Sequence, residues 1–298
     1  MTFMFFLILT LAHLIADFYL QTEKMVKNKE KHILLHLTHH FITTFFFLVL
    51  LYLWSNRMTS MLFHILYPTV AIICFHLLID ILKIKIWNKV AKGPKKNTWE
   101  FILFITDQLL HFVSIVLVSS FFSGKSTFHY FYQFILILER SPEVENYLSP
   151  MNLAIFIIIM LIIITTVSGN GIRLLLGTLP EHIALFEGKY TFDQVIDNVE
   201  MMKRDGKLGI MSEQYNYMLV RKQDLSRGKI IGYLERLIII ILVINDQYTA
   251  IAFILTAKSL ARFKQMDDRE WAEYFLLGTL SSIFLAIVYG IFIRSIIF

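Results

Sequence analysis

The chain contains 298 residues, of which 56% are hydrophobic, and its mean hydropathy is +0.62. No soluble domain of this length could bury so many apolar side chains in one core, so that class of protein is excluded. The formal net charge is +5, but the basic residues lie in short segments between apolar runs. This pattern orients a membrane protein and gives no reason to expect nucleic acid as a partner. Composition therefore predicts an all-α, polytopic transmembrane helical bundle.

Six apolar stretches are long enough to cross about 30 Å of hydrocarbon. In chain order they are residues 2–20, 33–54, 61–83, 101–122, 151–177 and 272–293. The first stretch lacks the basic start and the small-residue cleavage site of a signal peptide, so we expect it to be retained. Residues 230–245 and 247–262 are apolar but short, and they either cross a thin bilayer or form a re-entrant hairpin. The chain is thus expected to have six to eight spans.

Loop charges divide the chain into regions and orient it. The lysine-rich and arginine-rich segments all belong on one side, which is cytoplasmic by the positive-inside rule, and both termini are then extracytoplasmic. The expected organisation is a four-helix transmembrane core with the His/Asp motifs (1–122), an extracytoplasmic loop (123–150), a fifth transmembrane helix (151–178), a cytoplasmic helical insert (179–229) and a transmembrane hairpin followed by the last helix (230–298).

Four of the apolar stretches carry a histidine with a second metal-type ligand one helical turn away. The motifs are His13-Leu-Ile-Ala-Asp17, His36-Leu-Thr-His39-His40, His76-Leu-Leu-Ile-Asp80 and Asp107-Gln-Leu-Leu-His111. Residues three or four apart lie on one helix face, and such polar groups are costly in lipid. The predicted topology places all four motifs roughly 10 Å below the cytoplasmic surface. If these helices pack as a bundle, their polar faces can meet in one site.

The ligand types indicate a transition-metal site. Imidazole and carboxylate suit Zn above all, with Mn, Fe or Ni as alternatives. The expected ligands are His13, Asp17, His36, His39, His40, His76, Asp80, Asp107 and His111. A bound metal could polarise a phosphoryl or acyl oxygen and activate water, with Asp17 or Asp107 as the catalytic general base. The alternative is that these groups only form hydrogen bonds between helices.

A second charged group lies in the last third of the chain, again near the predicted cytoplasmic face. It includes Glu235, Lys258 and Glu273, and we expect structural ion pairs in which Lys258 binds Glu235 or Glu273. The alternative is an anion-binding clamp for a phosphate head group, with Arg173, Lys258 and Arg262 as the donors.

The four motifs also carry a resemblance. Together with the lysine-rich turn after Gln21, they resemble an uncharacterised bacterial membrane family, domain of unknown function 3307, over about the first 120 residues. Residues 231–236, 257–263 and 272–279 are similar to longer members of that family. The resemblance implies a location in the bacterial cytoplasmic membrane but no established activity. The His-x-x-x-Asp helices are loosely similar to inner-membrane hydrolases inferred to depend on a metal.

Three functions follow as hypotheses. The first is a metal-dependent hydrolase that acts on a lipid-linked or amphiphilic phosphate or ester, with membrane lipid as its partner. The second is a non-enzymatic anchor or sensor that recruits a cytoplasmic protein through residues 179–229. The third is a divalent-cation transporter, although nothing in the outer halves of the first two spans (residues 2–10 and 45–54) would carry an ion onward.

Overall fold

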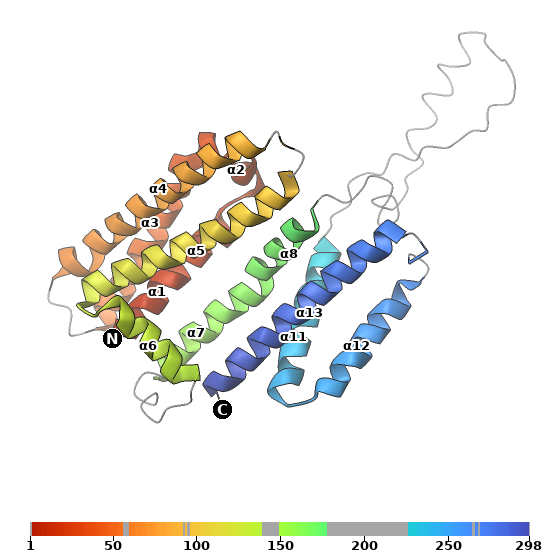
Figure 1. Ribbon diagram of the computed structural model, residues 1–298. Helices are drawn as coiled ribbons and strands as arrows, with labels where there is room; N and C mark the ends of the chain where they lie inside the picture. The colour runs from red at the N-terminus through yellow and green to blue at the C-terminus, as the bar shows by residue number, and fades with distance from the viewer. Residues whose placement is uncertain are drawn as a thin grey trace, which may run out of the picture.

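The computed structural model describes residues 2–55, 60–91, 93, 96–138, 149–177, 226–263, 266–267 and 269–297. All the regular elements in these ranges are helices, which confirms the predicted all-α class (Figure 1). The predicted insert, residues 179–229, lies almost wholly outside the described residues, which resume at 226.

The first half of the chain forms a compact group of helices. It consists of α1 (Thr2–Ile15) with the π-helical turn η1 (Ala16–Leu20), α2 (Glu23–Lys27), α3 (Lys29–Trp54), the π-helical turn η2 (Leu62–Leu66) with α4 (Tyr67–Val90), α5 (Lys96–Ser123) and α6 (Thr127–Leu138). Helices α3, α4 and α5 run alternately up and down beside α1 (Figure 1). This packing places the motif-bearing faces of the four long helices toward one another.

The second half packs against the first through α7 and α8. It consists of α7 (Pro150–Ile162), the π-helical turn η4 (Ile163–Val167), α8 (Ser168–Leu176), α11 (Ser226–Ile244), α12 (Tyr248–Ala261) and α13 (Arg269–Ile297). Helix α7 begins where Ser149 caps it, since the Ser149 hydroxyl accepts a hydrogen bond from the Asn152 N–H at 3.3 Å and Pro150 occupies the first turn.

Six helices are long and apolar enough to cross a membrane. They are Phe3–Leu20, Lys29–Trp54, Leu62–Val90, Lys96–Ser123, Pro150–Leu176 and Arg269–Ile296. Each corresponds to one of the six predicted stretches, and many large apolar side chains on their outer faces are exposed, as a lipid-facing surface requires. The chain therefore has the architecture of a multi-pass membrane protein.

The short helices α11 and α12 form a hairpin that reaches the far end of α13. Asp246 in the hairpin turn forms an ion pair with Arg294 in the last turns of α13. Nearby, a Cβ on Gly290 would lie 2.8 Å from the Cβ of Val243 on α11, so the two backbones approach closely. The hairpin thus extends along α13, but neither α11 nor α12 is among the described helices that are long and apolar enough to span a membrane.

The predicted loop at residues 123–150 contains a helix that we did not predict. Helix α6 has twelve residues, too few to span a membrane. Its Tyr130 packs on Phe6 of α1, with ring centroids 5.5 Å apart. A second contact, an apolar cluster of Leu136 and Ile296 with Phe3 against it, joins α6 to the beginning of α1 and the end of α13. Both termini of the described chain therefore lie at one end of the bundle, as predicted.

An apolar core fills the first half on the side of the termini. Its buried members are Met4, Phe5, Ile8, Leu9, Leu48, Leu51, Ile65, Ile72, Ile115 and Val118. The polar motifs occupy the opposite halves of the same helices, so the core closes the bundle beneath them.

Candidate metal centre

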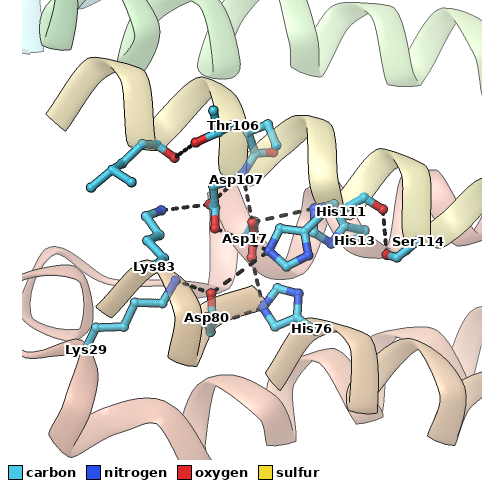
Figure 2. A network of polar contacts seen from close by, with 12 residues as sticks. His13, Asp17, Lys29, His76, Asp80, Lys83, Thr106, Asp107, His111 and Ser114 are labelled. Atoms are coloured by element: carbon cyan, nitrogen blue, oxygen red, sulfur yellow. Dashed lines mark hydrogen bonds and ion pairs between the residues drawn. The ribbon is translucent and has the colours of Figure 1, made fainter. Parts of the chain in front are cut away.

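The helices α1, α3, α4 and α5 bring the four motifs together into one buried cluster. Its members are His13, Asp17, His36, His40, His76, Asp80, Asp107 and His111, and we call it the His/Asp cluster. Figure 2 shows His13, Asp17, His76, Asp80, Asp107 and His111. The five histidine side chains are almost fully buried, and the most exposed of the three carboxylates, Asp17, is only 8% exposed. Eight of the nine predicted ligands therefore meet at one place.

Asp17 lies at the centre of the cluster. Its Oδ1 atom lies 2.9 Å from Nε2 of His40 and 3.2 Å from Nε2 of His36. His76 Nε2 lies 3.8 Å from the same oxygen, and His13 Nε2 lies 3.6 Å from Oδ2. Asp17 belongs to η1, a wide turn of the kind that is frequent at functional sites. One carboxylate thus faces imidazoles from three helices.

The second carboxylate, Asp80, lies beside the His36 and His76 rings. The Nε2 atoms of these two rings are 3.0 Å apart. Asp80 Oδ2 lies 3.5 Å from Nε2 of His76 and 3.8 Å from Nε2 of His36. The three side chains can each offer one atom to a common ion.

The third carboxylate, Asp107, extends the cluster to α5. Its Oδ1 atom lies 3.5 Å from Nε2 of His111, one helical turn away. His111 Nε2 also lies 4.0 Å from Oδ1 of Asp80, which joins this part of the cluster to α4. Asp17, Asp107 and His111 form a third group of ligand-type atoms within reach of one ion.

Several atoms that point into the cluster have no hydrogen-bond partner among the described residues. They are Nε2 of His13, Nε2 of His111, Oδ2 of Asp80 and Oδ1 of Asp107. Buried polar atoms are normally paired, so four convergent exceptions need a cause. A metal–nitrogen bond of about 2.1 Å places neighbouring ligands roughly 3.0–3.4 Å apart. The separations in the cluster lie near that range, so the donor set fits a divalent transition metal.

The outward Nδ1 atoms of His36, His40 and His76 are also without a hydrogen-bond partner in the described part of the chain. In many metal sites this atom donates to a second carboxylate or carbonyl that fixes the ring. Among the described residues, only contacts at the inward Nε2 atoms, such as that of His40 with Asp17, can therefore set the tautomers of the three rings.

Two lysines that we predicted only as loop charges reach into the cluster. Lys29 Nζ donates to Oδ1 of Asp80 at 2.5 Å, and Lys83 Nζ donates to Oδ2 of Asp107 at 2.7 Å. A signal was present in the sequence, because residues 29, 36 and 40 share one helix face and residues 76, 80 and 83 share another. Gln108, also missed, donates to Oδ2 of Asp17 at 3.2 Å.

The charges of the cluster do not balance. Three buried carboxylates face two ammonium groups, so with neutral imidazoles one negative charge remains. Asp80 and Asp107 each have a lysine, whereas the contacts of Asp17 are to imidazoles and an amide. A buried charge is costly without a counter-charge, and a bound cation beside Asp17 would supply one.

His39 was predicted as a ligand but lies outside the three groups. It is half-buried on α3, directly before His40. Successive helical residues point about 100° apart, so His39 and His40 cannot both face the cluster.

The charged group in the second half forms separate contacts. Lys258 Nζ donates to Oε2 of Glu235 at 2.6 Å, one of the two predicted pairings. Glu273 instead accepts from Arg269 at 2.9 Å on the exposed surface. Arg262 lies over the Trp271 ring, 5.7 Å from its centroid. The remaining predicted anion donor, Arg173, is exposed on α8.

Arg236, next to Glu235, is the most deeply buried cation of this half, at 3% exposure. Its Nε donates to the Ile164 carbonyl at 2.7 Å and its Nη2 donates to the Thr165 carbonyl at 3.1 Å. Its Nη1 donates to the Ser282 hydroxyl at 3.3 Å. Both carbonyls belong to η4, so this guanidinium ties the π-helical turn to α11 and α13.

Comparison with known proteins assigns a family to the first half of the chain. No curated protein matches, and no solved structure matches. Residues 5–138 match the sequence model of a family described as "Protein of unknown function (DUF3307)". The match contains the whole His/Asp cluster with Lys29 and Lys83, and it extends beyond the expected 120 residues to the end of α6. The first half of the chain is therefore similar to this uncharacterised family.

Proposed function

We propose that the protein is a metal-dependent hydrolase of the bacterial cytoplasmic membrane, acting on a lipid-linked or amphiphilic phosphate or ester. The observation that carries the proposal is the convergence of imidazole nitrogens and carboxylate oxygens from four helices, with four inward atoms left unpaired. Zn suits this donor set best, and Mn, Fe or Ni are alternatives.

The position of the cluster supports a hydrolase more than a divalent-cation transporter. The lysines at its mouth belong to the end of the bundle that the positive-inside rule assigns to the cytoplasm, and both termini are then extracytoplasmic. Beneath the cluster the described core of the first half is mainly apolar; its buried polar groups are hydroxyls such as those of Thr69 and Ser119, and it buries no charged side chain that would carry an ion across. A substrate can therefore approach from the cytoplasm or from the inner leaflet.

The residues suggest a division of roles. His13, His40 and His76 with Asp17 form the largest group that could hold one ion, and His36 with Asp80 lies directly beside it. A bound divalent ion supplies a Lewis acid and an activated water. Oδ1 of Asp107 has no hydrogen-bond partner among the described residues and lies 3.5 Å from Nε2 of His111, so it could accept a proton, which makes Asp107 the preferred general base.

Metal analysis of the purified full chain tests this proposal. We expect wild-type protein to retain close to stoichiometric Zn, Mn, Fe or Ni after dialysis, and a His13→Ala, His76→Ala double variant to lose it. A His39→Ala variant is the matched control, because it removes a neighbouring imidazole from outside the cluster. A wild-type sample that holds no more metal than the double variant would show that the cluster is a structural polar network.

A further inference from the structure

Lys29 and Lys83 form the only charged mouth of the His/Asp cluster among the residues that the structure describes. Figure 2 shows both ammonium groups on one side of the carboxylates, with the rings of His13 and His111 on the other side. Lys29 is 17% exposed and Lys83 is 27% exposed, whereas the histidines and carboxylates behind them are 8% exposed or less. Anything that enters from this side meets the two ammonium groups first.

The sign of the charge at this mouth depends on whether a cation is bound. Without one, the three carboxylates outweigh the two ammonium groups by one charge. One divalent cation among the inward atoms changes the balance to one net positive charge. The carboxylate oxygens would then be shared with the cation, and the attraction that holds each ammonium to its carboxylate would weaken. The loaded cluster should therefore attract an anion where the empty cluster repels it.

We propose that Lys29 and Lys83 form a phosphate-binding pair that becomes available when the cluster holds a divalent cation. The inference rests on the proposed function and deepens it, because it selects phosphate anions over neutral esters as substrates. Ammonium groups on flexible side chains are common phosphate ligands, and an anion between them would complete the charge balance of the loaded cluster. Lysines that served only to neutralise carboxylates would not make the site prefer phosphate anions over neutral esters.

The test is whether phosphate changes the affinity of the cluster for the divalent cation. Isothermal titration of the purified full chain in neutral detergent would measure the cation Kd with and without inorganic phosphate. Because coupling is reciprocal, phosphate should tighten cation binding by about fivefold or more. Cation binding that is unchanged by phosphate would overturn this inference and leave the metal site intact. A chain that binds no cation would overturn both proposals.

The Lys83→Met variant tests whether the coupling between phosphate and cation binding depends on this lysine pair. Lys83 is the more exposed of the two. Its removal leaves Asp107, which is 4% exposed, without its lysine, whereas removal of Lys29 would leave the fully buried Asp80 without one, so Lys83 is the less disruptive choice. We expect this variant to retain cation binding but to lose most of the coupling to phosphate. Lys85→Met is the matched control, because Lys85 is an exposed lysine on the same helix. Equal coupling in both variants would contradict the assignment.

Two further ligands separate the sources of phosphate. A short-chain phosphatidic acid presents a lipid phosphate, and a diacylglycerol with the same acyl chains presents only neutral esters. Coupling with both inorganic phosphate and phosphatidic acid would show that the anion suffices, and coupling with phosphatidic acid alone would show that the lipid is needed. Either result supports the phosphate pair. Equal coupling with diacylglycerol would overturn it in favour of an ester site.

Discussion

The two halves of this molecule bury charged groups in opposite ways. In the second half, Arg236 is almost fully buried, and each of its three nitrogens donates to a carbonyl or a hydroxyl. In the first half, the His/Asp cluster is just as deeply buried, yet four inward atoms have no hydrogen-bond partner among the described residues, and the charges do not balance. The hydrogen bonds of Arg236 are made within the chain, whereas unpaired atoms that converge on one point, as in the His/Asp cluster, indicate a ligand.

This contrast explains why burial alone does not identify a site in a membrane protein. Both regions contain charged side chains in spanning helices, and such a side chain is usually taken as a sign of a functional site. The contacts of Arg236 show a different use, because the wide turn η4 releases carbonyls that the guanidinium then binds. Changes in the two halves should therefore affect different measurements: metal content in the first and thermal stability in the second.

The largest effect is expected from Asp17→Asn. The change removes the carboxylate that lies nearest to the His36 and His40 nitrogens, and it preserves the size of the side chain. Cation affinity should fall on the order of 100-fold, as measured by titration of the metal-free protein. The metal-free variant should keep its Tm, because the two remaining carboxylates then balance the two lysines.

The matched control for this prediction is Asp246→Asn, which alters a carboxylate in the exposed turn between α11 and α12. Its cation affinity should equal that of the wild type. If Asp17→Asn retained the full cation affinity of the wild type, the buried charges of the first half would have a structural role, as Arg236 has in the second half.

Arg236→Met should have the next largest effect, and on stability alone. The variant keeps an unbranched apolar side chain but removes the guanidinium that donates to the carbonyls of Ile164 and Thr165. We expect the free energy of unfolding in detergent to fall by about 2–4 kcal/mol, seen as a lower Tm, with metal content unchanged. Arg269→Ala, which breaks an exposed pair with Glu273, should leave the Tm unchanged. Loss of metal in Arg236→Met would contradict the separation of roles.

Much of the cluster could be predicted because helical spacing is a local property. A ligand four residues from a histidine in an apolar helix, such as Asp17 after His13, must share its face wherever the helix packs. The same rule excludes His39 once His40 is accepted, since adjacent residues point in different directions. Loop charges then placed the four motifs at one depth, and the structure brings them together there.

The features that the sequence did not predict depend on contacts between segments that are distant in the chain. Lys29 and Lys83 were counted as loop charges because hydropathy windows end at the first lysine, although both helices continue and place the side chains in the cluster. The pairing of Lys258 with Glu235, and not with Glu273, required the position of α12 beside α11. Helix α6 was missed because it is too short for a span and is held in place by packing on α1.

The smallest effect is expected where the second half is most tightly packed, at Gly290. A Cβ there would lie 2.8 Å from Cβ and Cγ1 of Val243, so Gly290→Ala must push α13 away from α11. The free energy of unfolding should fall by about 1–3 kcal/mol. Gly228→Ala on α11 is the control, since an added Cβ meets nothing within 4 Å and alanine favours the helix. Metal content should be unchanged in both variants, because neither contacts the His/Asp cluster. Metal loss in Gly290→Ala alone would show that the packing of α13 on α11 sets the geometry of the cluster, and the two halves would then act as one unit.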